Sequence, residues 1–226
     1  MDEYTNNAKF YDPIVGPFLR STHKDIVDIL QNHGCHNVLD LCCGTGLFAG
    51  QAQNAGMHLT GVDISPTMLD VARTNLPEID FLQHDASSLP MGNETYDAVT
   101  ISFALHEKPR EVALAITKEA LRLVRKDGLL VVADYRYPTK RKSIFIGWII
   151  RLVEHMAGTE HNAHFQNYMK QGGSEVFLAE AGLNATRLTT HMGGWSGVFV
   201  QRGGELEPVS RGYTQKDELP DSFANT

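Results

Sequence analysis

The chain has 226 residues, of which 42% are hydrophobic and 21% are charged. This length and composition predict one globular domain with an insertion, and they argue against a disordered chain or a coiled coil. With 20 Lys and Arg against 27 Asp and Glu, the net charge of -7 disfavours nonspecific binding to nucleic acid or to an anionic membrane surface.

The sequence contains no sign of export or of membrane insertion. The longest uncharged apolar stretches, 98–105 and 143–150, are far shorter than a membrane-spanning helix. The amino-terminal residues lack a basic segment followed by an apolar run, so we expect no secretory signal. Two of the three cysteines, Cys42 and Cys43, are adjacent and poorly placed to pair with each other. We therefore expect a cytoplasmic protein in a reducing compartment.

Apolar spacing predicts strands that alternate with helices over the first two thirds of the chain. The expected helices are 18–33, 47–54, one begun by Ser65 and Pro66, and 109–125 with Gly128 as its left-handed cap. The expected strands are 38–41, 59–62, 81–82, 96–102 and 129–134. This alternation predicts an α/β fold with a doubly wound, mostly parallel sheet.

The alternation stops after the fifth strand. Residues 138–172 are expected to form a helical insertion, followed by a helix at 174–181. Residues 185–191 and 197–201 then predict a closing antiparallel hairpin, which brings the sheet to seven strands. We expect one domain over residues 1–202, with a helical cap at 1–34 and a polar, flexible tail at 203–226.

The stretch VLDLCCGTG at 38–46 places Gly44 and Gly46 where the first strand turns into a helix. Such a turn lets a ligand approach the backbone and directs the helix N–H groups at it. The next glycine, Gly50, comes too late for the dinucleotide pattern GxGxxG. By itself the turn is also compatible with a tight turn that binds nothing.

Three acidic residues belong to successive strands at the same expected edge of the sheet. Asp63 ends the second strand, where a carboxylate can accept both ribose hydroxyls of a nucleoside. Asp85 follows the third strand and can accept the amino hydrogen of an adenine, while Asp40 in the first strand can hold an ammonium group. Together with the glycine turn, these acids predict a pocket for adenosine attached to a cation.

Five segments in order resemble the successive motifs of class I S-adenosylmethionine-dependent methyltransferases. They are VLDLCCGTG at 38–46, GVDIS at 61–65, HDASSLP at 84–90, YDAVTISFALHE at 96–107 and LRLVRKDGLLVVADY at 121–135. The resemblance covers residues 10–202 and is nearest to the quinone and phospholipid branch of that family. It implies a Rossmann-like fold, S-adenosyl-L-methionine as cofactor and in-line methyl transfer to a small-molecule acceptor.

The resemblance also implies which residues bind the cofactor. They are Asp40, Gly44 and Gly46 around the methionine part, Asp63 at the ribose, Ile64, Met68, Asp85 and Ala86 at the adenine, Ser102 and Phe103 at the amine, and Tyr11 as a closing residue. Many members have Gly where this chain has Cys42. We interpret Cys42 and Cys43 as small packing residues, since nothing in the sequence activates their thiols.

Three residues are candidates for the acceptor side. His106, just beyond the fourth strand, is the first candidate for a general base or an acceptor-orienting group, and Glu107 is expected to cap the next helix. The resemblance implies an acceptor lid in the insertion, where His164 and Tyr168 are expected to touch the acceptor. A base is needed only if the acceptor must lose a proton.

Two further patterns in the insertion leave alternatives open. His161 and His164 with Glu160 suggest a metal site, but they lack a thiol partner and zincin spacing, so we expect no metal. An apolar stripe is most often core, yet it also leaves open a lipophilic acceptor, such as a quinone precursor or lipid, or peripheral contact with a membrane. The stripe consists of Phe145, Trp148, Ile149, Leu152 and Met156.

We therefore predict an S-adenosylmethionine-dependent methyltransferase that acts on a small molecule, with no nucleic-acid partner. Two other classes stay open. A noncatalytic adenine-nucleoside-binding module would keep the roles of Asp63 and Asp85 without methyl transfer. A nicotinamide-dependent oxidoreductase would need the closer third glycine. The acceptor atom and the oligomeric state do not follow from the sequence.

Overall fold

The computed structural model describes residues 8–138 and 144–204. The side chains of residues 8–15, 144, 156 and 157 lie outside this description. The predicted tail lies outside the described residues from residue 205 onward.

Seven strands of the described chain form one mixed sheet in the order β3-β2-β1-β4-β5-β7-β6. They are β1 (Asn37–Leu41), β2 (His58–Asp63), β3 (Asp80–Gln83), β4 (Tyr96–Ser102), β5 (Val124–Tyr135), β6 (Thr186–His191) and β7 (Ser196–Arg202). Strands β1 to β5 pair in parallel, whereas β7 pairs antiparallel with both β5 and β6. The predicted doubly wound sheet with a closing hairpin is confirmed.

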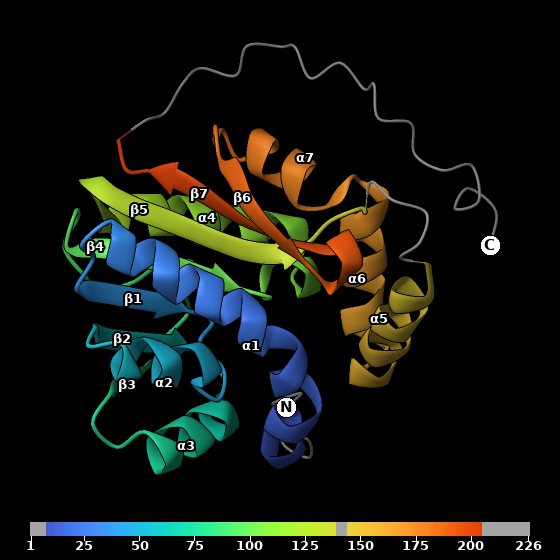
Figure 1. Ribbon diagram of the computed structural model, residues 1–226, viewed down its shortest axis with the longest axis horizontal. Helices are drawn as coiled ribbons and strands as arrows, with labels where there is room; N and C mark the ends of the chain where they lie inside the picture. The colour runs from blue at the N-terminus through green and yellow to red at the C-terminus, as the bar shows by residue number, and fades with distance from the viewer. Residues whose placement is uncertain (1–7, 139–143, 205–226) are drawn as a thin grey trace.

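Helices cover both faces of this sheet, with α1 on one face and α4 on the other (Figure 1). The helices are α1 (Ala8–Asn32), α2 (Leu47–Asn54), α3 (Pro66–Asn75), η1 (Leu105–Glu107), α4 (Arg110–Leu123), α5 (Ile144–Ala157), α6 (Thr159–Lys170), α7 (Gly173–Glu180) and η3 (Met192–Gly194). Helices α5 and α6 pack together beside the end of the sheet to which the β5 arrow points (Figure 1). The carboxyl ends of the parallel strands therefore face the predicted insertion.

The apolar sequence of β5 matches its central place in the fold. Leu130 and Val131, which point to opposite faces, are both buried, because α1 and α4 each pack against this strand. Strand β5 is also where the pairing changes, since β4 is its parallel neighbour and β7 its antiparallel one. The long apolar run is thus explained by two covered faces. None of the described helices is long and apolar enough to cross a membrane.

The predicted start of α3 is confirmed. The Ser65 hydroxyl accepts a hydrogen bond from the Met68 N–H at 3.2 Å, and Pro66 occupies the first turn. Helix α1 is longer than the predicted 18–33, since it begins at Ala8 and continues through Pro17.

Two predictions around α4 are wrong. Glu107 does not cap this helix, because Pro109 occupies the N-cap without a side-chain hydrogen bond and Glu107 pairs with Lys108 instead. Helix α4 ends at Leu123, and Gly128 lies inside β5 rather than at a left-handed cap. A Cβ at Gly128 would lie 2.4 Å from the Asp97 carbonyl oxygen, so close approach of the backbones explains the glycine.

Candidate functional site

A cavity of about 360 Å³ lies at the carboxyl ends of the parallel strands. Its wall contains the three acids predicted from the sequence, Asp40, Asp63 and Asp85. Six other predicted residues also line it: Gly44, Ile64, Met68, Ala86, Ser102 and Phe103. The structure therefore brings together residues from four successive strand ends.

Two predicted cofactor residues lie elsewhere or outside the description. Gly46, with φ 80°, is the N-cap of α2, and a Cβ there would come within 3.0 Å of Leu76 and 3.1 Å of Phe81. This glycine allows the turn to pack against α3 and β3, and it is not among the residues that line the cavity. Tyr11 lies on α1, but its side chain is outside the described residues.

Asp63 is held in place by the backbone of the glycine turn. Its Oδ2 accepts a hydrogen bond from the Gly44 N–H at 2.8 Å, and its Oδ1 accepts one from the Ser65 N–H at 2.9 Å. Burial raises the pKa of Asp63, although these two backbone hydrogen bonds act in the opposite direction. The carboxylate is thus fixed in orientation at the edge of the cavity, where further hydrogen-bond donors can reach it.

Asp40 is the most deeply buried of the three acids. Its Oδ1 accepts a hydrogen bond from the Thr100 hydroxyl at 2.7 Å, across the parallel pair of β1 and β4. Burial raises the pKa of Asp40 to about 7, despite the opposing hydrogen bond from Thr100. A cation in the cavity would stabilise the ionised form of this group.

The third acid lies at a more open part of the wall. Asp85 is exposed, and a backbone hydrogen bond from Ser87 at 2.8 Å lowers its pKa. Nearby in the same wall, Met68 is buried while Ile64 is 62% exposed. A carboxylate and two apolar side chains in one wall suit a flat heterocycle with an exocyclic amino group.

Cys42 stands where the resemblance implies glycine in many members, and its backbone adopts a conformation that glycine takes most easily. Its backbone has φ 57°, a left-handed conformation that is uncommon for a residue with a Cβ. Burial raises the pKa of the Cys42 thiol and that of the Cys43 thiol. Both thiols are therefore held in the neutral form, as expected for packing residues.

Sequence reasoning missed His23, which reaches the cavity from α1. Its Nε2 lies 2.9 Å from the Ser102 hydroxyl, and its Nδ1 has no hydrogen-bond partner among the described residues. Burial lowers the pKa of His23 to about 4, so the imidazole is neutral. The available signal was helical spacing, because His23 falls between the buried Leu19 and Ile26 on one face of α1.

The wall of the cavity also contains an ion pair between Glu107 and Lys108. Although burial acts to raise the pKa of Glu107, Lys108 and His161 lower it. Lys108 in turn has a raised pKa, because Glu107 outweighs the effect of its own burial. Both groups are thus charged beside the cavity.

His106 lies behind this ion pair and is not among the residues that line the cavity. Its Nδ1 is 2.6 Å from Asp134 Oδ1, and its ring packs edge-on against Tyr135 with centroids 4.7 Å apart. Although burial acts to lower the pKa of His106, the carboxylates of Asp134 and Glu154 raise it. A buried imidazole held in this way can orient its neighbours.

The two candidates on α6 do not line the cavity either. Tyr168 is buried and donates a hydrogen bond to the Ser174 hydroxyl at 3.1 Å. The side chain of His164 is 26% exposed and lies 3.9 Å from Glu160. His161 Nε2 lies 2.6 Å from Glu154 Oε2. His161 therefore pairs with Glu154 of α5, and the grouping of Glu160, His161 and His164 considered from the sequence is not formed by the described residues.

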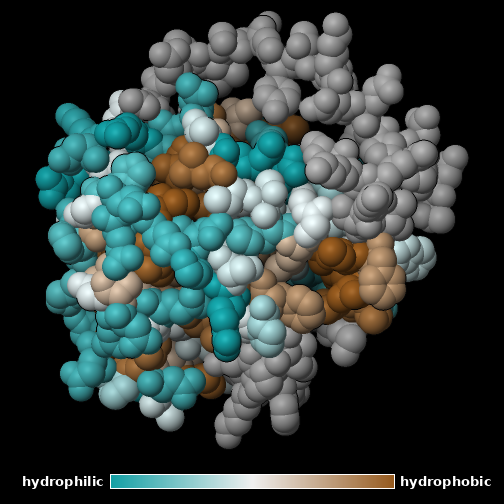
Figure 2. Space-filling view, viewed as in Figure 1, coloured by the Kyte–Doolittle hydropathy of each residue, from teal (hydrophilic) through white to brown (hydrophobic). Residues whose placement is uncertain are grey.

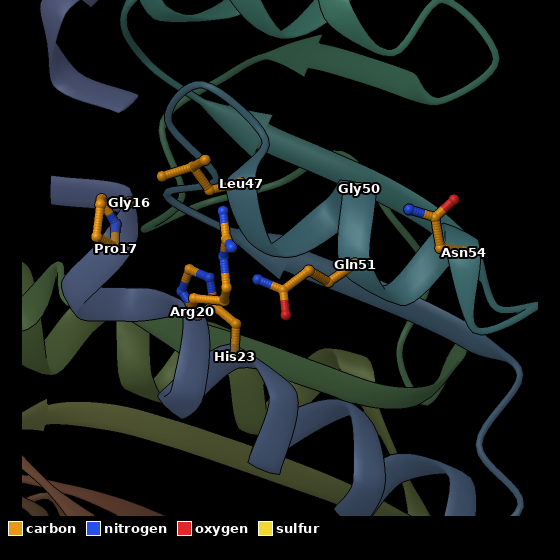
Figure 3. A pocket seen from close by; sticks show the side chains of 8 residues that line it. All are labelled: Gly16, Pro17, Arg20, His23, Leu47, Gly50, Gln51 and Asn54. Carbon is orange, nitrogen blue, oxygen red and sulfur yellow. The ribbon is translucent and has the colours of Figure 1, made fainter. Parts of the chain in front are cut away.

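A second hollow, of about 600 Å³, lies between helices α1 and α2. Figure 3 shows Arg20 and Gln51 extending into the space between the two helices. It shares His23 with the cavity at the strand ends but contains none of the predicted acids. The chemistry predicted from the sequence is therefore concentrated in the smaller cavity.

Comparison with known proteins agrees with this geometry. Residues 38–128 match the family model described as a methyltransferase domain. This part of the chain is therefore similar to a methyltransferase domain, and it contains all three acids of the cavity and both glycines of the turn.

Curated relatives match about half of the chain. A demethylmenaquinone methyltransferase of Renibacterium salmoninarum is 39% identical over 116 residues, which cover 50% of this chain and 47% of the relative. A demethylmenaquinone methyltransferase of Paenarthrobacter aurescens is 35% identical over 121 residues, which cover 53% of this chain and 46% of the relative. The chain thus spans about half the length of the curated relatives it matches.

Solved structures share the fold over most of the chain. An O-methyltransferase family protein of Burkholderia thailandensis superposes with a TM-score of 0.66 at 17% identity, covering 86% of this chain and 59% of that one. A protein of Pyrococcus horikoshii gives a TM-score of 0.61 at 18% identity, covering 81% and 91%. The chain therefore has the Rossmann-like fold that the sequence predicted.

Proposed function

We propose that this protein transfers a methyl group from S-adenosylmethionine to a small, lipophilic acceptor. The observation that carries the proposal is the meeting of Asp40, Asp63 and Asp85 in one cavity beside the glycine turn. The methyl donor is S-adenosylmethionine, whose sulfonium supplies an already activated methyl group. The protein then has mainly to position the donor and the acceptor, which can lower the barrier by about 7–11 kcal/mol.

The residues of the cavity fit this donor in charge and in position. Asp63, whose orientation is fixed by the N–H groups of Gly44 and Ser65, would accept hydrogen bonds from the ribose hydroxyls. Asp40 in its ionised form would bind the ammonium group, and Asp85 would accept a hydrogen bond from the adenine amino group. Ile64 and Met68 would contact the adenine, and the backbone of Ser102 and Phe103 would lie near the amine.

We place the acceptor beside Glu107 and Lys108, which line the cavity where η1 meets α6. His106 remains the candidate for a positioning group, although it acts from behind Glu107 rather than at the cavity wall. His164 and Tyr168 remain predictions, and their positions favour support of the lid over contact with the acceptor. A proton can leave the acceptor through Glu107, whose ionised carboxylate lines the cavity.

Helix α5 supports a lipophilic acceptor and contact with a membrane surface. Phe145, Trp148 and Leu152 are 74%, 68% and 59% exposed on one face of this helix. The brown patch on the right of Figure 2 marks this part of the molecule. Such a patch is unusual on a soluble surface and suits a site that meets lipid. The relatives named for demethylmenaquinone support a quinone precursor as the acceptor class.

The two other classes considered from the sequence are less well supported. A nicotinamide oxidoreductase would need a glycine nearer to Gly46 than Gly50. A noncatalytic nucleoside-binding module would have no use for the charged pair of Glu107 and Lys108 on the acceptor side. We further infer that residues 1–202 act as one domain, and that the cysteine content favours a cytoplasmic location.

The proposal is tested by measuring donor binding first and methyl transfer to an acceptor second. Calorimetry should show binding of S-adenosylmethionine and of S-adenosylhomocysteine, with no binding of NAD under the same conditions. Radiolabelled donor should then transfer its methyl group to a short-chain demethylated naphthoquinol in detergent micelles. Donor binding with turnover of polar acceptors alone would refute the lipophilic acceptor and leave the donor site in place.

A further inference from the structure

A cluster of two imidazoles and one carboxylate lies behind the cavity, where η1, α5 and α6 meet. His106 comes from η1, Glu154 from α5 and His161 from α6, and their ligand atoms all lie within 4.8 Å of one another. His161 Nε2 is 2.6 Å from Glu154 Oε2, and His106 Nε2 is 3.5 Å from the same oxygen. The Nε2 atoms of both rings therefore converge on one carboxylate.

All three side chains are removed from water. His106 is 4% exposed, Glu154 6% and His161 11%. Burying a carboxylate and two imidazoles carries a large free-energy cost unless the groups are paired or bind a metal ion. The Tyr135 hydroxyl donates to the second oxygen of Glu154 at 2.9 Å and so fixes the carboxylate in place.

The far nitrogen of each imidazole also faces a carboxylate. His106 Nδ1 lies 2.6 Å from Asp134 Oδ1, and His161 Nδ1 lies 3.3 Å from Glu107 Oε2. In protein metal sites, the second ring nitrogen of a histidine ligand typically donates to such a carboxylate, which fixes the tautomer and leaves Nε2 free to bind. Both histidines have this arrangement, and it directs both Nε2 atoms to the same point.

The charges of the cluster favour a divalent cation. Asp134 and Glu154 raise the pKa of His106, so a bound cation would have to displace the proton from its Nε2. With both imidazoles then neutral, the carboxylates of Asp134, Glu154 and Glu107 together with the Lys108 ammonium leave two negative charges in a buried place. One divalent cation between the two Nε2 atoms and Glu154 would balance them. The donor set of two imidazoles and one carboxylate is that of a family of zinc sites with an open position.

We propose that His106, Glu154 and His161 bind a divalent transition-metal ion, with Zn²⁺ as the matching ion. The metal fastens α5 and α6 to η1, directly behind the Glu107 and Lys108 pair that lines the cavity. His106, Glu154 and His161 are not among the residues that line the donor cavity. The proposed metal site is therefore independent of which acceptor the protein uses. The opposing possibility is a hydrogen-bonded network of protonated imidazoles that binds no metal.

The first test measures metal content in the untagged full chain. The protein is treated with a chelator, dialysed, titrated with Zn²⁺ against a chromophoric chelator, and measured by mass spectrometry for bound metal. We expect about one equivalent in the wild type and a loss of at least tenfold in affinity in His161→Gln. His164→Gln is the matched control on the same helix, because its imidazole lies outside the cluster, and it should bind like the wild type.

A second test needs no variant and so does not depend on how His161→Gln folds. X-ray absorption of the zinc-loaded wild type should show nitrogen and oxygen neighbours at about 2.0–2.1 Å, with outer-shell scattering from two imidazoles. Absence of bound zinc in the wild type would overturn the proposal. A sulfur neighbour at about 2.3 Å, or equal binding by His161→Gln and His164→Gln, would overturn it as well.

Discussion

Asp63, at the end of β2, accepts a hydrogen bond from the backbone N–H of Gly44 in the turn that follows β1. This contact joins the two strand ends and orients the carboxylate toward the cavity. The glycine turn therefore positions an acid as well as leaving room for a ligand.

Asp63→Ala should weaken donor binding steeply. Each charge-assisted hydrogen bond to a ribose hydroxyl contributes about 1.5–3 kcal/mol, so the Kd should rise at least about tenfold. Calorimetric titration with S-adenosylhomocysteine measures this directly. Asp80→Ala is the matched control, since Asp80 is an exposed acid at the start of the neighbouring β3. An unchanged Kd in Asp63→Ala would remove the basis of the donor site.

Donor affinity should depend on pH through Asp40. The pKa of this carboxyl is about 7, raised by burial, and the cationic donor binds its ionised form. Affinity should therefore rise as the pH increases through about 7 and fall toward acid, with about one proton released per ligand bound at acid pH. Titrations at several pH values, in buffers of different ionisation enthalpy, measure both quantities. In Asp40→Asn the proton release should disappear, and its persistence would show that another group titrates.

The same group has a predictable effect on the stability of the ligand-free protein. Its pKa in the folded chain lies above the ordinary 3.8, so protonation favours the fold. This stabilisation is fully present below the pKa of the unfolded chain and is lost as the pH rises through about 7. Denaturant unfolding of wild type and Asp40→Asn across that interval should show a smaller loss in the variant. Parallel curves for the two proteins would contradict the raised pKa.

Gly61→Ala should destabilise the protein, because β2 passes close to Phe81 at this residue. An added Cβ would lie 2.6 Å from Phe81 Cδ1 and 2.9 Å from Cys43 Sγ. Overpacking of this kind costs about 1–3 kcal/mol, which lowers the Tm of a protein of this size by several degrees. Gly92→Ala is the control, since its Cβ would meet Thr95 Oγ1 at 3.4 Å. Equal Tm values in the two variants would disprove the close packing.

Trp148→Asp should impair turnover of a lipophilic acceptor without affecting the donor. The side chain is 68% exposed on α5, and burying an aromatic side chain in a lipid surface contributes about 1.5–3 kcal/mol. We expect roughly tenfold weaker sedimentation with vesicles and a lower rate on the vesicle-borne acceptor, with the Kd for S-adenosylhomocysteine unchanged. Leu188→Asp, on β6, is the control for an exposed apolar residue elsewhere. If both variants sediment like the wild type, α5 does not contact lipid.

Much of the fold followed from local sequence signals. Strand β4 and helix α2 have the predicted bounds, because each combines a clear apolar pattern with neighbouring turn residues. Gly128 was wrongly predicted to be a helix cap, because it follows a run of helical residues in the sequence. In the structure it lies in β5, where the backbone passes close to Asp97 of β4 and leaves no room for a Cβ. A contact between backbones far apart in the chain leaves no local pattern.

The donor side of the site was predictable for the same reason, since Asp40, Asp63 and Asp85 each follow or lie in a recognisable strand. The cluster of His106, Glu154 and His161 was not, because three separate elements contribute one residue each. Glu154 lies in an apolar helix where a single carboxylate gives no signal of its own. The role of Tyr168 stays a prediction, and the structure adds that its hydroxyl donates a hydrogen bond to the Ser174 hydroxyl.

Asp40, Asp63 and Asp85 all come from the continuous stretch that ends before η1, whereas α5 and α6 belong to one later insertion that contributes no residue to the wall of the cavity. The three acids and the insertion are therefore separate blocks of sequence. A chimera that exchanges residues 138–172 for the equivalent segment of a relative would keep every one of those acids in place. If the proposed function holds, such a chimera should change acceptor preference and leave donor affinity unchanged.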